Sequence, residues 1–352
     1  MVAFEVNIMK QRDMVHNLMQ ADFTLGPPLL GCAESRQTGL SLIADNHELL
    51  AFAPIDAQTG RDAYETGLLA PLHAAFPHGE ERIEIRLAGH YSPKNHVEGD
   101  WVASSGHIAG VFEADLFGIP ATGQTAFVRF GRFERFVNSK IVETLVLLDL
   151  PSLMMQAGVW PLAPSMGPWS IAPGPRAQDG IVPRDVSGGV DSLALVEAMI
   201  GGLHHFDGKG LQSMGMRRYW SEHFWWYGPA SIGNFRGHED YERGHQGPFL
   251  TAFPDRVGGN HRCRIGEGNY VASTGWPSIT ATHTGGGWLG LAPTGRAISM
   301  RVMDFWRREG DRLDENWVMI DLIDLLNQMG LDVFARLKAR DTHHHLTIHS
   351  GD

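Results

Sequence analysis

The chain repeats its own sequence once, and this duplication limits the possible folds more than any other feature. Residues 60–77 recur as 237–254, and 99–106 recur as 268–275, in the same order and at an offset of 169 to 177 residues. A repeat of this length is a duplicated domain, because the units of a solenoid are only about 20–50 residues long. The two copies of each position can therefore be compared within one sequence.

Length and charge narrow the class of protein. A chain of 352 residues has room for about two domains, in agreement with the repeat. Its net charge of −11 argues against nucleic acid or a membrane surface as partner, since both require concentrated Lys and Arg. The two cysteines, Cys32 and Cys263, are too far apart in the chain to suggest a disulfide framework, so we expect a reducing, cytoplasmic location. We find no signal peptide and no apolar run near the roughly 18 residues that span a bilayer.

Composition along the chain predicts five segments. They are an N-terminal appendage with an amphipathic stretch at Ile8–Met19, a first domain, a Pro/Gly-rich linker, a second domain and a flexible tail, at residues 1–36, 37–160, 161–190, 191–338 and 339–352. The second domain is expected to open with a helix near Asp191 and Ser192.

Within each copy, helical patterns precede strand patterns. Tyr64–Phe76 and Tyr241–Phe253 read as helices that stop at a Phe-Pro pair, because proline cannot continue a helix. Alternating strand-like runs follow, at 82–87, 101–105, 125–133 and 141–149, and again at 261–265, 270–274, 297–306 and 317–322. This order predicts an α+β domain: a curved antiparallel sheet with helices packed on its concave side.

The same blocks carry a resemblance to a known family. Thr282–Arg296, Met303–Trp306 and Asp314–Trp317 resemble the SnoaL-like polyketide cyclases, and the first copy is similar at Leu116–Gly123 and Ile141–Thr144. The resemblance implies two tandem cone-shaped domains of the NTF2-like fold. The halves are then expected to pack as an intramolecular pseudo-dimer, and the whole chain could form a homodimer.

The resemblance also implies a reaction. Family members close a ring by intramolecular aldol condensation on a hydrophobic carbonyl or ester substrate, without a cofactor. Asp304 matches the acid/base aspartate, since a carboxyl in an apolar pocket has a raised pKa and can both accept and return a proton. His283 matches a pocket histidine that polarises or orients the substrate. The alternatives are a water-facing or Arg301-paired Asp304 and a solvent-facing His283.

A dense set of aromatic residues accompanies these two candidates. Such residues either form an ordinary core or line a cavity for a flat substrate. As candidate substrate-binding residues in the second copy we take Tyr227, Trp225, Trp276, Trp288, Trp306 and Asn316.

Comparison of the copies assigns catalysis to the second. Counted from the shared Thr-Gly turn, Asp304 aligns with Arg132, so the first copy lacks the acid/base residue. There, His107 and Arg132 are candidate substrate-binding residues, and an arginine in a pocket can bind a carboxylate or phosphate. The alternative function is a non-catalytic small-molecule-binding or scaffold protein.

We expect no metal site despite eighteen histidines. The runs His204–His205 and His343–His345 are adjacent in sequence, which does not place imidazoles on one face as an i, i+4 pair would.

Overall fold

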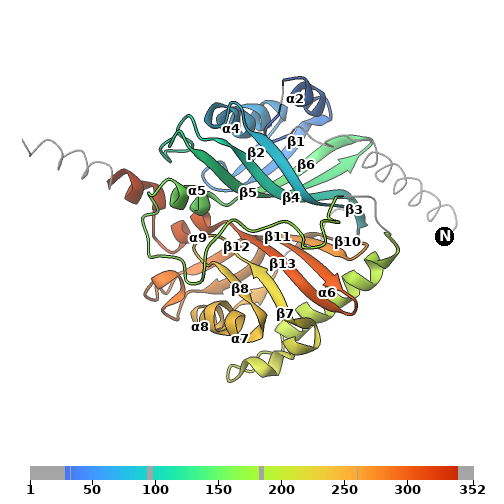
Figure 1. The fold of residues 1–352 in the computed structure, drawn as a ribbon, viewed down its shortest axis with the longest axis vertical. Coiled ribbons are helices and arrows are strands. Elements are labelled where there is room, and N and C mark those ends of the chain that lie inside the picture. Colours follow the sequence, from blue (N-terminus) through green and yellow to red (C-terminus); the bar gives the residue numbers. More distant parts are fainter. Residues whose placement is uncertain (1–27, 32, 93–97, 182–185, 260, 340–352) are drawn as a thin grey trace, which may run out of the picture.

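The structure, a computed structural model, describes residues 28–31, 33–92, 98–181, 186–259 and 261–339. The Ile8–Met19 stretch, Cys32 and the tail from residue 340 lie outside these ranges. Two sheets pack against each other in the middle of the molecule, and helices cover the outer face of each sheet (Figure 1).

The described part of the first half contains a six-stranded sheet in the order β2-β1-β6-β5-β4-β3. Its strands are β1 (Ile43–Ala51), β2 (Ala57–Thr59), β3 (Glu80–Tyr91), β4 (Gly99–Val111), β5 (Thr125–Val137) and β6 (Lys140–Leu148). Its helical segments are α2 (Ala33–Leu40), α3 (Arg61–Ala63), η1 (Tyr64–Leu69), α4 (Ala70–Ala75) and α5 (Leu150–Gln156).

The second half repeats this plan in a seven-stranded sheet, counted over the described residues, with main order β10-β11-β12-β13-β7-β8 and β9 beside β11. Its strands are β7 (Trp220–Tyr227), β8 (Asn234–Arg236), β9 (Val257–Gly258), β10 (His261–Glu267), β11 (Tyr270–Thr282), β12 (Ala297–Glu309) and β13 (Arg312–Ile320). Its helical segments are η2 (Val186–Gly188), α6 (Gly189–Leu203), η3 (Leu211–Met214), η4 (Met216–Arg218), α7 (Gly237–Tyr241), η5 (Glu242–Gln246), α8 (Gly247–Ala252), η6 (Trp288–Gly290) and α9 (Leu322–Gln328).

The predicted α+β architecture of two related domains is confirmed, with one difference in the sheets. They are mixed, not purely antiparallel, because β1 pairs with β6 and β7 pairs with β13 in parallel. The repeat did not reveal β1 and β7, since the matched sequence begins only at Gly60 and Gly237. In addition, the burial of β1 does not alternate, and alternation is the main signal of a strand.

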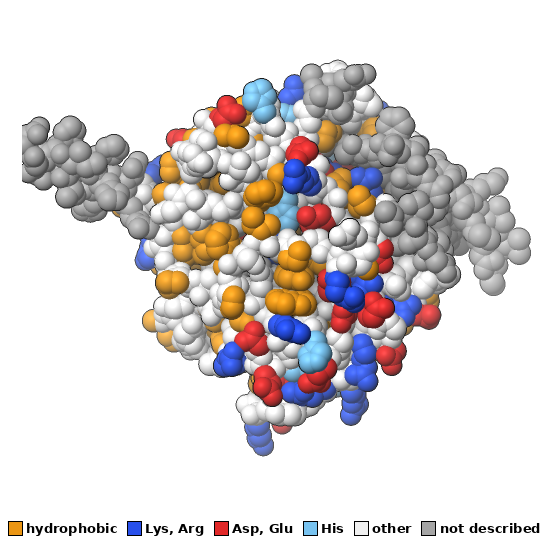
Figure 2. All heavy atoms as spheres, in the orientation of Figure 1, with side chains coloured by type: hydrophobic (Ala, Val, Ile, Leu, Met, Phe, Trp, Pro, Cys, Tyr) orange, Lys and Arg blue, Asp and Glu red, His pale blue; other side chains and the backbone are white. Residues whose placement is uncertain are grey.

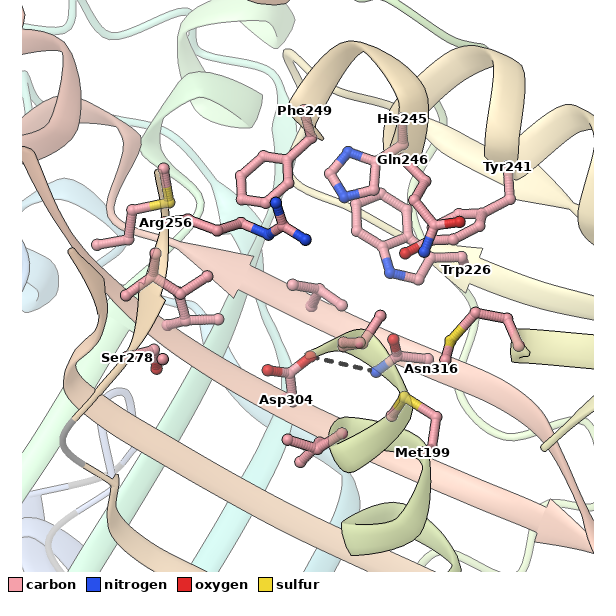
Figure 3. A pocket seen from close by; sticks show the side chains of 18 of the residues that line it. Met199, Trp226, Tyr241, His245, Gln246, Phe249, Arg256, Ser278, Asp304 and Asn316 are labelled. Carbon is pink, nitrogen blue, oxygen red and sulfur yellow. Dashed lines mark hydrogen bonds between the residues drawn. The ribbon is translucent and has the colours of Figure 1, made fainter. Parts of the chain in front are cut away.

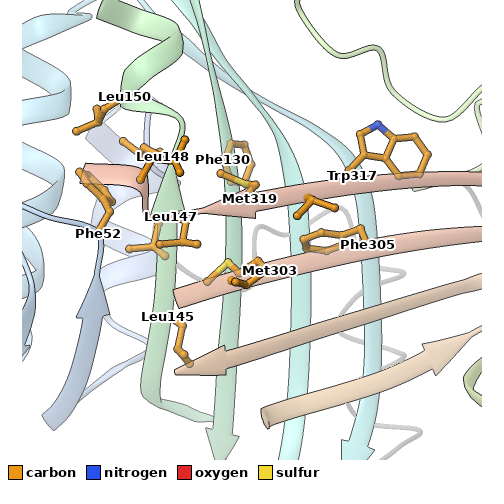
Figure 4. Close-up of a cluster of buried hydrophobic side chains, with 14 of the residues drawn as sticks. Phe52, Phe130, Leu145, Leu147, Leu148, Leu150, Met303, Phe305, Trp317 and Met319 are labelled. Carbon is orange, nitrogen blue, oxygen red and sulfur yellow. The ribbon is translucent and has the colours of Figure 1, made fainter. Parts of the chain in front are cut away.

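The two sheets form one apolar core between the halves (Figure 4). Phe133 of β5 and Phe305 of β12 lie with ring centroids 5.6 Å apart. At Gly131 an added Cβ would lie 3.0 Å from the sulfur atoms of both Met303 and Met319. Close packing of this kind is typical of an obligate interface and not of loosely tethered domains.

Equivalent polar contacts cross this interface in both directions. Asp149 caps α5 through Ser152 N at 3.1 Å, and its other oxygen accepts from Ala230 N at 3.1 Å. Asp321 caps α9 through Asp324 N at 3.1 Å and reaches Ala53 N at 2.9 Å in the first half. The halves are thus related as subunits of a symmetric dimer would be, within one chain.

The Pro/Gly-rich linker lies along both halves. Met166 N donates to Ser231 O at 3.1 Å, Arg176 N donates to the Glu315 carboxylate at 3.0 Å, and Gly180 O accepts from Arg86 N at 3.0 Å. Figure 2 shows acidic and basic side chains interspersed over the same face. None of the helices within the described ranges has the length and apolarity needed to span a membrane.

Candidate active site

A cavity of about 550 Å³ lies between the sheet and the helices of the second half (Figure 3). Strand β12 forms part of its floor. Successive strand residues point to opposite faces, so Met300, Val302, Asp304 and Trp306 line the cavity. The intervening Met303 and Phe305 belong to the core between the halves.

The other walls come from elements distant in sequence. Strand β13 contributes Asn316, helix α6 contributes Met199, and strand β7 contributes Trp226. The helical segment opposite the sheet supplies Tyr241, His245, Gln246 and Phe249. Most of the lining is therefore apolar or aromatic, with a few convergent polar groups, as in small-molecule sites generally.

Asp304 is the carboxyl group in the centre of this floor. Its side chain is partly accessible, but through the cavity. Burial raises its pKa to about 7, and Asn316 and the positive charge of Arg264 oppose this shift. Asn316 Nδ2 lies 3.5 Å from Asp304 Oδ1 and donates a shorter bond of 3.1 Å to Phe305 O. Asp304 can thus exchange a proton near neutral pH.

Hydrogen-bonding groups face Asp304 from the helices. Burial lowers the pKa of His245 to about 3, so its imidazole is neutral, and it stacks on Trp226 with centroids 4.1 Å apart. Burial and the nearby Asp304 carboxylate raise the pKa of Tyr241, which keeps its phenol protonated. Gln246 is buried against the cavity, and its amide has no hydrogen-bond partner among the described residues.

Three of the predicted site residues meet at the cavity: Asp304, Trp306 and Asn316. His283 does not. It is fully buried beside Phe253, and its Nδ1 lies 3.1 Å from Thr294 Oγ1. It also lies beside the start of β12, roughly 25 Å along the strand from Asp304 at about 3.3 Å per residue.

Two further predicted residues lie on the opposite face of the sheet. Trp225 and Tyr227 stack on each other at 5.7 Å, and Tyr227 stacks on Trp317 at 5.6 Å. Only Trp226, which lies between them in β7, lines the cavity, because strand residues alternate between faces.

Trp288 and Trp276 are also away from the cavity. Trp288 is fully buried against Phe249 and Phe253, behind the cavity wall. Trp276 lies under the guanidinium of Arg301, with the guanidinium carbon 5.2 Å from a ring centroid. Both are packing residues in this structure.

In the first half the residue that corresponds to Asp304 is held by other side chains of the protein. Arg132 pairs with Ser104 across the sheet, as Asp304 pairs with Ser273, so the alignment of Arg132 with Asp304 is correct. Arg132 is buried, 3.0 Å from Glu81 and 3.7 Å from Glu134. The Arg132 guanidinium, which was expected to bind a ligand, thus forms ion pairs with these two internal carboxylates.

His107 is likewise engaged within the first half. Its Nδ1 lies 3.1 Å from Glu84, and it borders a pocket of only about 10 Å³. The structure therefore does not bring His107 and Arg132 to a cavity of useful size.

Sequence reasoning missed the helical wall, although the repeat contained a signal for it. At the offset of the first repeated block, His245 and Gln246 correspond to Leu68 and Leu69. Two polar residues in a helix whose other copy is apolar indicate a changed environment, here the cavity.

Comparison with known proteins now adds the family. The model of the SnoaL-like polyketide cyclases matches residues 94–157 and 212–329, one segment in each half and together more than half of the chain. The chain belongs to the SnoaL-like polyketide cyclase family. No curated protein sequence matched it.

Solved structures that resemble this SnoaL-like chain are similar at low identity. AclR of Streptomyces galilaeus, a proposed hydroxylase, is 24% identical, covering 40% of this chain and 85% of AclR, with a TM-score of 0.32. IdmH of Streptomyces antibioticus, a proposed polyketide cyclase, is 18% identical, covering 42% and 97%, with a TM-score of 0.30. An NTF2-like protein of Burkholderia xenovorans LB400 is 14% identical, covering 40% and 97%, with a TM-score of 0.32.

Proposed function

We propose that the second half of this protein is a cofactor-free acid/base catalyst of ring closure in a hydrophobic carbonyl or ester substrate, as in polyketide cyclases. One observation carries the proposal: the Asp304 carboxyl lies on the floor of an apolar cavity of about 550 Å³, with its pKa raised by burial to about 7. A group with this pKa is effective both as base and as acid at neutral pH.

The proposed reaction is balanced without a co-reactant. The Asp304 carboxylate removes a proton from a carbon activated by a neighbouring carbonyl. The resulting enolate attacks a second carbonyl of the same molecule, so that a carbon–carbon bond forms and that oxygen becomes an alkoxide. Protonated Asp304 then returns its proton to the alkoxide, and the aspartate is regenerated.

Neighbouring groups have supporting roles in this proposal. The Tyr241 phenol and the Gln246 amide face the cavity and donate hydrogen bonds to substrate oxygens on which negative charge develops. Asn316 holds the Asp304 carboxyl in place from the adjacent strand. The aromatic walls bind the apolar body of the substrate and exclude water.

A ligand screen on paired variants tests the proposal. Aromatic β-keto esters, anthracycline-like precursors, steroids and lipophilic epoxides are screened by thermal shift, and every compound that binds is assayed for turnover. The proteins are wild type, Asp304→Asn and the control Asp311→Asn. Asp311 is the control position because its side chain, in the turn after β12, is 92% exposed.

We expect a β-keto ester or related compound to stabilise all three proteins, and only wild type and Asp311→Asn to convert it. Turnover that is indifferent to Asp304→Asn overturns the acid/base assignment. Binding without turnover in any protein favours the non-catalytic small-molecule-binding function instead.

A further inference from the structure

Arg256 brings a positive charge to the cavity, and no residue in the described part of the chain pairs with it. It lies between α8 and β9, just after the Phe253–Pro254 pair, and its side chain extends into the cavity (Figure 3). Among the described residues its guanidinium has no hydrogen-bond acceptor and no carboxylate, and its central carbon lies 5.3 Å from the centroid of the Phe206 ring. The adjacent Asp255 carboxylate instead accepts from Thr282 N at 2.8 Å.

The other charged groups along the cavity leave this one unmatched. Arg264 is engaged by Ser273 Oγ at 3.3 Å and by Glu197 at 3.8 Å. Glu242 and Asp304 are the carboxylates of the lining, and neither forms an ion pair with Arg256. A half-buried guanidinium without an acceptor has lost part of its hydration, and the Phe206 ring offsets this loss only in part. A ligand that supplied a charged acceptor would therefore bind favourably here.

The corresponding position of the first half has a different environment. Arg256 corresponds to Gly79, counted from the Phe-Pro pair that both copies share. A Cβ at Gly79 would lie 2.7 Å from Leu30 Cδ1, because the segment before α2 packs there with Leu29 and Leu30 buried. In the first half a leucine thus packs against this position, whereas in the second half an arginine extends from it into the cavity.

From these contacts we propose that Arg256 anchors a carboxylate of the substrate, so that the cavity selects flat apolar molecules with an acidic group at one end. A guanidinium binds a carboxylate through two parallel hydrogen bonds, which fixes orientation as well as charge. In Figure 3 the Arg256 side chain lies across the cavity from Asp304, so a molecule held at Arg256 extends toward the carboxyl. This substrate class rests on the proposed function, but the binding step can be measured without turnover.

Paired probes that differ only in charge test the anchor. Dissociation constants of 2-naphthoate and 2-naphthamide are measured by isothermal titration calorimetry on full-length wild type, Arg256→Gln, Arg256→Lys and Asp304→Asn. Arg243→Gln is the matched control, because it removes the same charge from a side chain that is 78% exposed and paired with Asp240. Thermal melts establish that each variant is folded.

We expect wild type, Asp304→Asn and Arg243→Gln to bind the carboxylate about tenfold or more tightly than the amide, as is typical of a charge-assisted contact. Arg256→Gln should bind both probes alike, and Arg256→Lys should retain part of the preference. Equal affinities in wild type, failure of the carboxylate to bind, or a preference that survives Arg256→Gln would each overturn the anchor.

The two proposals fail in different ways. If carboxylates bind in a way that depends on Arg256, but no β-keto acid or ester is converted, the anchor is supported and the catalytic function is excluded. If turnover depends on Asp304 but neither on Arg256 nor on a substrate carboxylate, the catalytic function is supported and the anchor is excluded.

Discussion

At the scale of single residues, the protonation of Asp304 links the stability of the fold to the proposed chemistry. Its carboxyl is held in an apolar cavity, and Asn316 and Arg264 only partly offset the cost of ionising it there. Its counterpart in the first half, Arg132, is neutralised by two buried glutamates. One position of the fold thus contains a proton-exchanging acid in one copy and a static ion cluster in the other.

Replacement of Asp304 by Asn should stabilise the protein at pH 8 and have little effect at pH 4. The folded pKa of about 7 lies above the unfolded value of about 4, so folding favours the protonated acid. Its stabilisation is complete below about pH 4 and is lost as pH rises through about 7. We expect a difference of roughly 1–3 kcal/mol at pH 8, reduced by contact with water in the cavity. Urea unfolding of both proteins at several pH values measures it, and a pH-independent difference would contradict the raised pKa.

The same ionisation should appear in the rate. For a substrate from the screen, kcat/KM should rise about tenfold per pH unit below pH 7 and level off above it, because the base is the carboxylate. His245 should add no further inflection to the pH–rate profile in this range, since its pKa is about 3. A profile that is flat from pH 5 to 8 would exclude Asp304 as the base.

At the scale of elements, the helix that follows each sheet begins at an aspartate that both caps the helix and contacts the other half of the chain. Asp321 caps α9, accepts from Ala53 N of the other half and lies 3.1 Å from Arg301. Among the described residues, Asp332 acts only as a cap: its carboxylate accepts from Ala335 N at 2.8 Å at the start of the helical residues 333–339.

Asp321→Ala should therefore cost more stability than Asp332→Ala. A lost cap alone costs about 1 kcal/mol, whereas a buried carboxylate whose partners remain unpaired costs about 2–4 kcal/mol. Chemical denaturation of the two variants gives the comparison. Equal losses would mean that the contact between the halves contributes nothing.

At the scale of the whole molecule, the core between the sheets makes the halves dependent on each other. Wild type should unfold in one calorimetric transition, because separating the halves exposes the apolar faces of both sheets. Phe305→Ala should lower stability by about 3–5 kcal/mol, since this ring packs against Phe133 across the interface. Two resolved transitions in wild type would show independent domains.

The sequence by itself determined what depends on local pattern. The duplication, the order of helices and strands, and the correspondence of Asp304 with Arg132 all follow from spacing along the chain. The helices and strands are visible in short windows through their periodicity, and the duplication and its matched positions are visible by direct comparison of the two copies.

Only the tertiary structure decided which side chains meet. Both faces of the second sheet are covered, so apolar residues occur on both, and alternation could not tell Trp226 from Trp225 and Tyr227. The parallel strands β1 and β7, the helical wall with His245 and Gln246, and the cavity-lining Arg256 come from segments far from β12. These segments come together only through the packing of the two halves and their layers, and a short stretch of sequence contains no information on that packing.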